Sequence, residues 1–445
     1  MLEFRRNDKD LISATHVCTQ WRSVLTSAPS LWTKVEFRDP SRALAYLTRS
    51  GTAPIDVSFT TTPDSSKLWP FYPKDYYTNR IPWFDRVQSI LLGGGDEQIE
   101  ATLRRLCPSA PLLRSLKLNG ISRWISTPWR TPGAVRSPGK LLGGQAPSLR
   151  NISLHSISPA LICKLPSANL TSLTWIGTFS DFPVCDLLPL LGSAPLLEVL
   201  TLDLRIQSVP TVERTMTLRL NKLRELTWLN SEGPFSLTSC LSAPELRSLT
   251  LRVEQALRAD HASILPPHQG RFPLLADPTQ ITYFIKWGTW SCQLKSPTSS
   301  IIVSEVAGKV WDVHPWFFRN KGIPFKKIKH MTIDVNSHPL GVFPTGWFEG
   351  LETLELVDGG NDYFTLIQPN SRGGNPIVPF PALREVSISF NTASSTRSLA
   401  GLAKILEQRK QEGREVNTVK IWGKRNEDIN KAVAKIRKSV GLVLG

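Results

Sequence analysis

The sequence has no apolar run that approaches the length of a membrane-spanning helix, and its first residues lack the apolar segment of a secretory signal peptide. Its six cysteines are scattered, without a Cys-x-x-Cys pair or the Cys/His spacing of a zinc site. A glycine-rich phosphate loop is missing, as are the Gly-x-Ser-x-Gly and His-Glu-x-x-His motifs. We therefore expect a protein of the cytoplasm or nucleus, or both, without a metal, a cofactor, a membrane anchor or enzymatic activity.

The residues that are present suit a folded protein made of many short elements. Apolar residues make up 41% of the 445-residue chain and charged residues 20%, which is enough apolar surface for a buried core. The 34 prolines favour helices and strands that end abruptly. Lysine and arginine outnumber the acidic residues by 53 to 37, most densely at 319–329 and 420–438. Because these stretches form no basic motif laced with aromatic residues, we interpret them as solvated surface, and nucleic-acid binding is a less favoured alternative.

A ten-residue stretch, SAPLLRSLKL at 109–118, returns almost unchanged as SAPLLEVLTL at 193–202. Both contain the pattern Leu-x-x-Leu-x-Leu. Exact or looser copies of this pattern lie at 113–118, 149–154, 170–175, 197–202, 223–228, 246–251, 328–333, 351–356, 383–388 and 416–421, with 87–92 as a candidate first copy. Within two blocks the copies start 21 to 36 residues apart, which is typical of a solenoid of leucine-rich type.

The spacing of the pattern predicts a short strand. Its fourth and sixth residues share one face of a strand, and one such unit buries its apolar face only when copies stack into a continuous core. Proline disfavours helix and biases the residue before it towards an extended conformation, so the Ala-Pro pairs mark the strand starts. We predict that Leu116, Leu200 and Trp175 are buried, whereas Lys117 and Thr201 face outward.

The segments between strands look partly helical, because 98–107 and 399–410 each place their apolar residues on one helix face. A strand and a helical return, repeated with right-handed crossovers, give a parallel sheet with helices outside it. The predicted fold is therefore α/β: a curved leucine-rich-repeat-like solenoid, with a parallel sheet and outer helices or loops, preceded by a short helical segment. The predicted domains are a helical segment at 1–40, a linker at 41–85, irregular repeats at 86–425 with a degenerate or inserted stretch at 252–327, and a C-terminal capping helix at 426–445.

Residues 1–40 do not follow the repeat. Leu11, Ala14, Cys18, Trp21 and Leu25 form a helical stripe that ends before the segment SAPSLW. This region resembles the second half of an F-box, in the form found in fungal F-box proteins with C-terminal leucine-rich repeats. The matching residues are Asp10, Leu11, Val17, Cys18, Trp21, Pro29, Leu31 and Trp32.

The resemblance implies a non-catalytic role in protein degradation. An F-box docks on a Skp-type adaptor of a cullin-based (SCF) ubiquitin ligase, while the repeats capture the protein to be modified. The residues expected to contact the adaptor are Leu11, Val17, Cys18, Trp21, Leu25, Leu31 and Trp32. A complete F-box opens with a helix that contains a Leu-Pro-x-Glu segment, and the 445-residue sequence does not include it. We therefore expect this chain to bind the adaptor weakly unless such a helix is added.

The target is expected to bind the concave face of the sheet, where outward strand positions are polar and of mixed sign. The candidate target-binding residues are Glu225, Arg252, Asp334, Glu355, Glu385, Lys420 and Trp422. Such a face suits a protein ligand held by several charge pairs. The main alternative is a repeat scaffold for protein interactions that has no association with a ligase.

Overall fold

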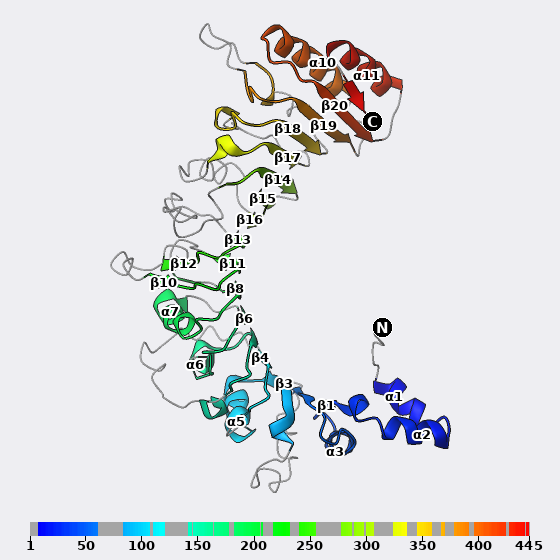
Figure 1. Cartoon of the computed structure of the whole chain (residues 1–445), viewed down its shortest axis with the longest axis vertical. Coiled ribbons are helices and arrows are strands. Elements are labelled where there is room, and N and C mark those ends of the chain that lie inside the picture. The colour runs from blue at the N-terminus through cyan, green and yellow to red at the C-terminus, as the bar shows by residue number, and fades with distance from the viewer. Residues whose placement is uncertain are drawn as a thin grey trace. The chain divides into compact units, whose positions relative to one another are not determined.

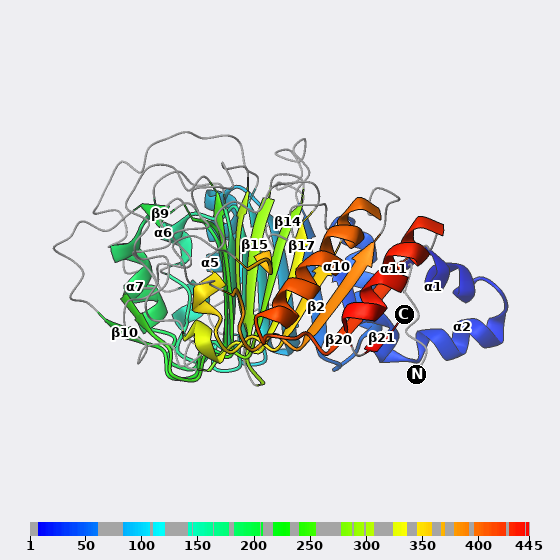
Figure 2. The same cartoon turned by 90° about the horizontal axis from the view of Figure 1, so that it is seen from above.

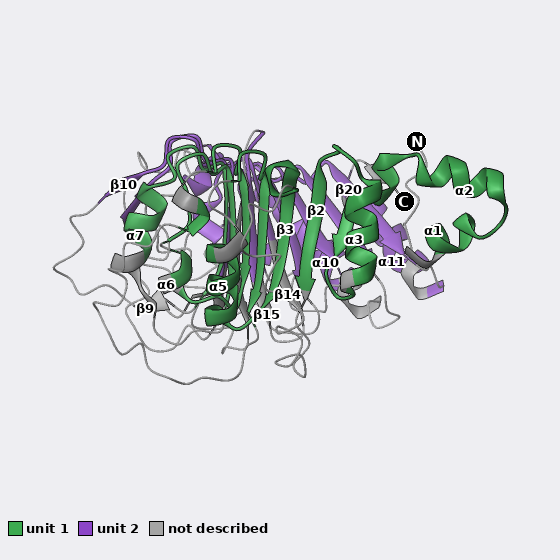
Figure 3. Ribbon diagram, turned by 90° about the horizontal axis from the view of Figure 1, so that it is seen from below, with its two compact units in different colours: residues 1–182, 186–204 green, residues 183–185, 205–445 purple. Residues whose placement is uncertain are grey.

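The computed structural model describes residues 8–60, 83–106, 110–120, 141–144, 146–162, 164–177, 182–204, 206–207, 217–231, 240–254, 277–286, 289–297, 300–306, 324–335, 345–357, 366–369, 378–390, 396–423, 427–440 and 442–444. The chain divides into two compact units: unit 1 is 1–182 with 186–204, and unit 2 is 183–185 with 205–445 (Figure 3). Each unit is built on a sheet of mainly parallel strands with helices, so the predicted α/β class is confirmed. Within the described ranges, no helix has the length and apolar character needed to cross a membrane.

Unit 1 starts with two short helices and continues into a parallel sheet. Its helices are α1 (Asp8–Thr15), α2 (Thr19–Thr26), α3 (Pro40–Arg49), α5 (Asp96–Leu106), α6 (Pro159–Ile162) and α7 (Val184–Gly192), with 3-10 helices η1 (Pro29–Trp32), η4 (Phe84–Arg86) and η6 (Leu141–Gly144). Its sheet contains, in order, β1 (Lys34–Glu36), β2 (Ile55–Thr60), β3 (Val87–Gly94), β4 (Ser115–Gly120), β5 (Asn151–His155), β6 (Ser172–Ile176) and β8 (Val199–Asp203), each parallel to the next. Figure 1 shows α5, α6 and α7 on one side of these strands.

The core of unit 1 follows the predicted alternation along each strand. Leu116 and Leu200 are fully buried, and Trp175, which takes the place of the last leucine of the pattern, is also buried. Lys117 is exposed and Thr201 is half-buried, since these intervening positions face away from the core. The inward and outward positions of the pattern are therefore as predicted. We call the side of each sheet that carries the outward residues its open face.

The Ala-Pro pairs form the turns that lead into the strands. The N–H of Leu113 donates to the carbonyl of Ala110 at 3.3 Å, and the N–H of Leu197 donates to Ala194 at 3.2 Å. Both alanines are buried. Proline suits the second position of such a turn because its ring fixes φ near the value that the turn requires. The pairs do mark the strand starts, as predicted, although the local device is a hydrogen-bonded turn.

Unit 2 is also built on a sheet of mainly parallel strands. Its strands are β9 (Ile206–Gln207), β10 (Leu218–Arg219), β11 (Glu225–Ser231), β12 (Leu241–Ser242), β13 (Ser248–Glu254), β14 (Gln280–Lys286), β15 (Thr289–Lys295), β16 (Ser300–Val306), β17 (His330–Val335), β18 (Thr353–Val357), β19 (Glu385–Phe390), β20 (Thr418–Gly423) and β21 (Leu442–Leu444). The short strand β7 (Phe182–Pro183) precedes them in the chain. The helices α10 (Thr396–Gln411) and α11 (Glu427–Ser439) lie side by side (Figure 2).

The predicted irregular stretch at 252–327 contains an antiparallel meander. The sheet order of unit 2 is β11-β13-β16-β15-β14-β17-β18-β19-β20-β21, and β15 runs antiparallel to both of its neighbours. Only two residues separate β14 from β15, and parallel strands would need a crossover of about a dozen residues. The described part of this stretch therefore includes one strand that runs against the direction of the repeats.

Two predicted boundaries need correction. Residues 41–85 are not simply a linker, because α3 and β2 lie within them and β2 pairs with both β1 and β3. Residues 61–82 of this stretch lie outside the described residues. The predicted C-terminal helix is present as α11, but β21 follows it and pairs with β20. In both places a short strand extends the sheet beyond the limits that the pattern gave.

Candidate functional site

The segment that resembles an F-box folds as two short helices joined by a turn. Cys18 is the N-cap of α2, where its Sγ accepts a hydrogen bond from the N–H of Trp21 at 3.5 Å. Arg22 Nε donates to the carbonyl of Thr15, the last residue of α1, at 3.0 Å. The chain therefore turns between the two helices, and the single helical stripe predicted through Cys18 is divided between them.

Exposed apolar side chains gather at α2. Val17 is 68% exposed, Trp21 is 55% exposed and Val24 is 61% exposed, and α2 buries none of its residues. Trp21 and Val24 are three residues apart and so share a helix face, while Val17 directly precedes the N-cap. We call these three residues the α2 patch. Sequence reasoning included Val17 and Trp21 but missed Val24, which the three-residue spacing from Trp21 indicates.

Trp32 is not available to a partner, contrary to the prediction. Its side chain is fully buried, and its Nε1 donates to the carbonyl of Leu25 at 2.8 Å. The ring meets that of Tyr46 edge to face at 5.0 Å between centroids, and the Arg49 guanidinium lies 4.4 Å from the Trp32 ring centroid. Trp32 therefore anchors the F-box-like segment to α3. Among the other predicted contacts Cys18 is exposed, and three leucines are half-buried: Leu11, Leu25 and Leu31.

The open face of unit 2 carries most of the predicted target-binding residues. Lys420 Nζ lies 2.6 Å from Glu385 Oε1, with both side chains about one-third exposed. Glu355 is exposed and accepts a hydrogen bond from Thr332 at 3.0 Å. The register places Glu355 and Lys420 on either side of Ser387. Thr332, Glu355, Ser387 and Lys420 therefore form one row across β17 to β20. Glu225, at the start of β11, is exposed as well.

Two further predicted target-binding residues differ in their exposure to solvent. Trp422 is 55% exposed, as predicted. Asp334 was predicted to face outward but is buried, with 6% of its surface exposed. It lies near the end of β17, in register with Phe284 of β14 and Val357 of β18. Arg252 belongs to β13, but its side chain lies outside the described residues.

In the basic stretch at 319–329, the three lysines that the structure describes are paired with acidic residues, and 319–323 lie outside the described residues. Lys326 lies 3.0 Å from Glu349, and Lys329 lies 3.2 Å from Glu352. Lys327 pairs with Asp277. All three lysines are exposed, so the interpretation as solvated surface is consistent with the structure, and each pair links residues that are distant in sequence. Exposed pairs of this kind contribute little to stability, and their charge is balanced locally.

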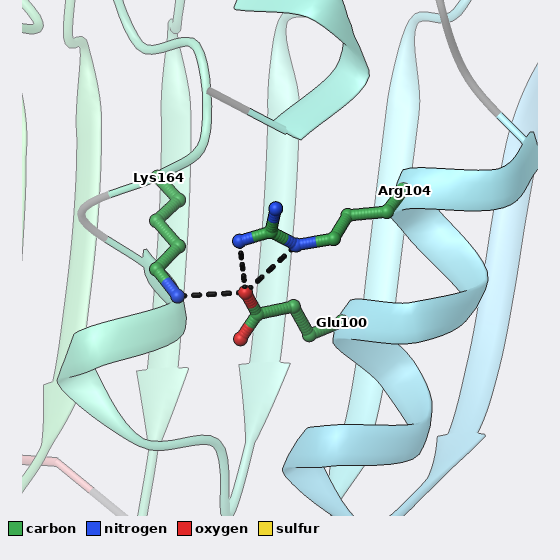
Figure 4. Close-up of polar contacts among 3 residues, drawn as sticks. All are labelled: Glu100, Arg104 and Lys164. Atoms are coloured by element: carbon green, nitrogen blue, oxygen red, sulfur yellow. Dashed lines mark hydrogen bonds and ion pairs between the residues drawn. The ribbon is translucent and has the colours of Figure 1, made fainter. Parts of the chain in front are cut away.

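Unit 1 holds one cluster of charged side chains on its helix-covered side (Figure 4). Glu100 of α5 accepts hydrogen bonds from Arg104 at 2.6 Å and from Lys164 at 2.7 Å. The hydrogen bond from Lys164 is the main cause that lowers the pKa of the Glu100 carboxyl. A carboxylate held by two cations is ionised at neutral pH. The cluster therefore ties α5 to the segment after α6.

Neither a scan against models of protein families nor a search of curated proteins finds a significant match to this chain. Within the described parts of the chain, no three His, Cys, Asp or Glu side chains come together in a way that could hold a metal ion.

Proposed function

We propose that this protein is a substrate-recognition adaptor of a cullin-type (SCF) ubiquitin ligase. The F-box-like segment binds a Skp-type adaptor, and the repeated strands form a leucine-rich-repeat-like solenoid that captures a protein target for degradation. The chain itself needs no catalytic residue, cofactor or membrane contact for this role, which it performs in the cytoplasm or nucleus. Support for the repeat assignment comes from the pattern Leu-x-x-Leu-x-Leu, whose copies occupy successive parallel strands in each unit.

The observation that carries the adaptor role is the α2 patch. Folded proteins seldom leave several large apolar side chains exposed together unless a partner covers them. Trp21 is the largest of the three, and tryptophan is the residue type most enriched among the side chains that dominate binding energy. The buried anchor Trp32 fixes the segment on α3, so the patch is presented by a supported helix pair.

Trp21→Ala is expected to weaken adaptor binding by about 30-fold, or about 2 kcal/mol, because it removes the central apolar contact. Binding is measured by calorimetry between a purified Skp-type adaptor and the chain, extended upstream by a Leu-Pro-containing helix. Gln20→Ala, an exposed change on the same helix, is the control and is expected to bind as the parent does. The unextended chain is expected to bind weakly.

Each outcome of this titration has a definite meaning. Tight binding by the 445-residue chain alone would show that the two helices suffice, and the adaptor role would stand. No binding by the extended chain would remove the ligase role and leave a repeat scaffold for protein interactions. Equal losses in Trp21→Ala and Gln20→Ala would place the contact away from the α2 patch.

The double variant Glu355→Lys with Glu385→Lys is expected to abolish capture of the target. It reverses the charge of two carboxylates on the open face of unit 2 and replaces the Lys420–Glu385 ion pair with two ammonium groups that repel each other. Proteins retained by the tagged chain are compared by quantitative mass spectrometry. The matched control is Glu349→Lys with Glu352→Lys, which also removes two paired carboxylates but before β18. If the variant Glu355→Lys with Glu385→Lys retains the same proteins as the parent, the target binds at another surface.

A further inference from the structure

The open face of β3 to β6 in unit 1 has an unusual set of side chains. The register aligns three rows across these strands: Ser89, Ser115, Asn151 and Ser172; Leu91, Lys117, Ser153 and Thr174; Gly93, Asn119, His155 and Ile176. These outward positions include one lysine and one histidine among hydroxyl, amide and a few apolar groups, and none of them is a carboxylate. The face is therefore rich in hydrogen-bond donors and has positive charge at one place.

Lys117 differs from Lys420 on the sheet of unit 2. It is exposed, and no ion pair of its ammonium group is present among the described residues. Lys420 of β20, by contrast, pairs with Glu385 of the neighbouring strand β19. Lys117 instead has Leu91 of β3 and Ser153 of β5 beside it in register. The described residues therefore leave its charge without an acidic partner.

The neighbouring histidine adds hydrogen-bonding capacity without adding charge. His155 is half-buried, and its Nε2 lies 3.2 Å from Ser153 Oγ. Burial, and then the charge of Lys117, lower the pKa of the His155 imidazole, so it is neutral at pH 7. Its neighbours across the sheet are Asn119 on β4 and Ile176 on β6, and the nearest acidic group in register is Asp203, on β8.

We propose that Lys117, Asn119, Ser153 and His155, here named the Lys117 patch, bind a carboxylate side chain of an acidic protein segment that lies on the open face of unit 1. One fixed positive charge matches the single negative charge of an Asp or Glu side chain, and the hydroxyl and amide groups supply further donors to its oxygens. A phosphate monoester carries nearly two charges and would call for a second cation, which the patch lacks. This site lies outside α2 and does not depend on the adaptor role.

The test uses the full chain and a fluorescent peptide of alternating Glu and Ser, about ten residues long so that it spans several strands. Anisotropy at low salt is expected to show binding that Lys117→Gln weakens about tenfold. The matched control is Lys326→Gln, an exposed lysine whose charge Glu349 already balances, and it is expected to leave the affinity unchanged. A peptide of alternating Gln and Ser is expected not to bind.

A second readout separates a specific contact from general attraction by a basic protein. A peptide bound at Lys117 changes both the burial of His155 and the charge beside it, so the titration of His155 is expected to shift when the Glu-Ser peptide is added. A pH titration by nuclear magnetic resonance follows the His155 ring, and its resonance is assigned by comparison with the variant His155→Gln.

Three results would overturn the proposal: equal loss in Lys117→Gln and Lys326→Gln, no change at His155 on binding, or binding of a phosphoserine peptide but not of the Glu-Ser peptide. Trp21→Ala, which tests the adaptor role, is expected to bind the peptide normally, so the two proposals can fail separately.

Discussion

Leu200→Asp is expected to lower the free energy of unfolding of unit 1 by about 4 kcal/mol or more, whereas Thr201→Asp is expected to change it by less than about 1 kcal/mol. Leu200 is fully buried on β8, where its register partner on β6 is the buried Leu173. A carboxylate at this position loses its water without gaining a partner. Thr201 is the next residue on the same strand, but its side chain lies on the open face and can remain solvated.

The measurement should report on unit 1 alone, because a chain with two compact units need not unfold in one transition. Hydrogen exchange of the β6 and β8 amides provides such a probe, supported by thermal denaturation of the whole chain. Leu200→Asp is expected to increase exchange throughout both strands. Similar exchange in the two variants would mean that the alternation of buried and outward positions has been assigned wrongly.

The repeated strands could be predicted from the sequence because one physical constraint recurs in each of them. A strand that buries one face must carry apolar residues at alternate positions, and stacking requires the same positions in each copy. This constraint tolerates substitution, which is why Trp175 could be placed in the core where leucine is usual. It also predicts Lys117 and Thr201 as outward residues.

The meander at β14 to β16 could not be predicted, because its outer strands give no sign of their direction and its middle strand does not carry the repeat. Short apolar runs such as ITYFIK and SIIVSEV indicate strands but carry no information on direction. The intervening strand TWSCQLK keeps none of the repeat, although Cys292 and Leu294 are buried. Direction is set by the shortness of the connections, and this becomes visible only when all three strands are recognised.

The F-box-like segment shows the limit of sequence reasoning for a binding surface. Periodicity identifies apolar residues that need cover, but it does not say whether the chain itself or a partner provides that cover. Trp21 and Trp32 looked equivalent in the sequence. The indole N–H of Trp32 donates to Leu25 and its ring packs on Tyr46, so the chain covers it, whereas Trp21 is left exposed. The two helices are separated by a turn at Cys18, and no strong helix-breaking residue in the sequence indicates this turn.

The second large effect is expected at Arg409 of α10, which is fully buried. Its Nη1 donates to the carbonyl of Pro379 at 2.6 Å and its Nη2 to the carbonyl of Phe380 at 3.0 Å. Phe380 has a φ of 48°, in the left-handed region that a residue with a side chain adopts only when its surroundings hold it there. Its ring packs against Phe348 at 6.2 Å between centroids, and Phe348 packs against Phe325 at 5.4 Å. The guanidinium therefore fixes the residue that ends a row of phenylalanines.

Arg409→Ala is expected to lower the free energy of unfolding by about 3 kcal/mol, since it leaves a cavity and removes the donors from the buried carbonyls of Ile367, Pro379 and Phe380. Arg409→Lys keeps the charge but not the planar fork, so it is expected to recover only part of the loss. Lys410→Ala is the control: this lysine lies on the surface, 3.5 Å from Glu415, and its loss is expected to cost less than about 0.5 kcal/mol.

The pH dependence of this loss follows from the direction of the Arg409 pKa. Burial, and then the charge of Arg414, lower that pKa to about 10, so the group is protonated in both the folded and unfolded chain at neutral pH. The cost of burying the charge is fully present below the folded pKa and is relieved only as the pH rises through it. The difference between the parent and Arg409→Ala is therefore expected to be constant across neutral pH, measured by denaturation together with hydrogen exchange of 378–390. Parent-like stability and parent-like exchange in Arg409→Ala would show that the phenylalanine row holds Phe380 in place without Arg409.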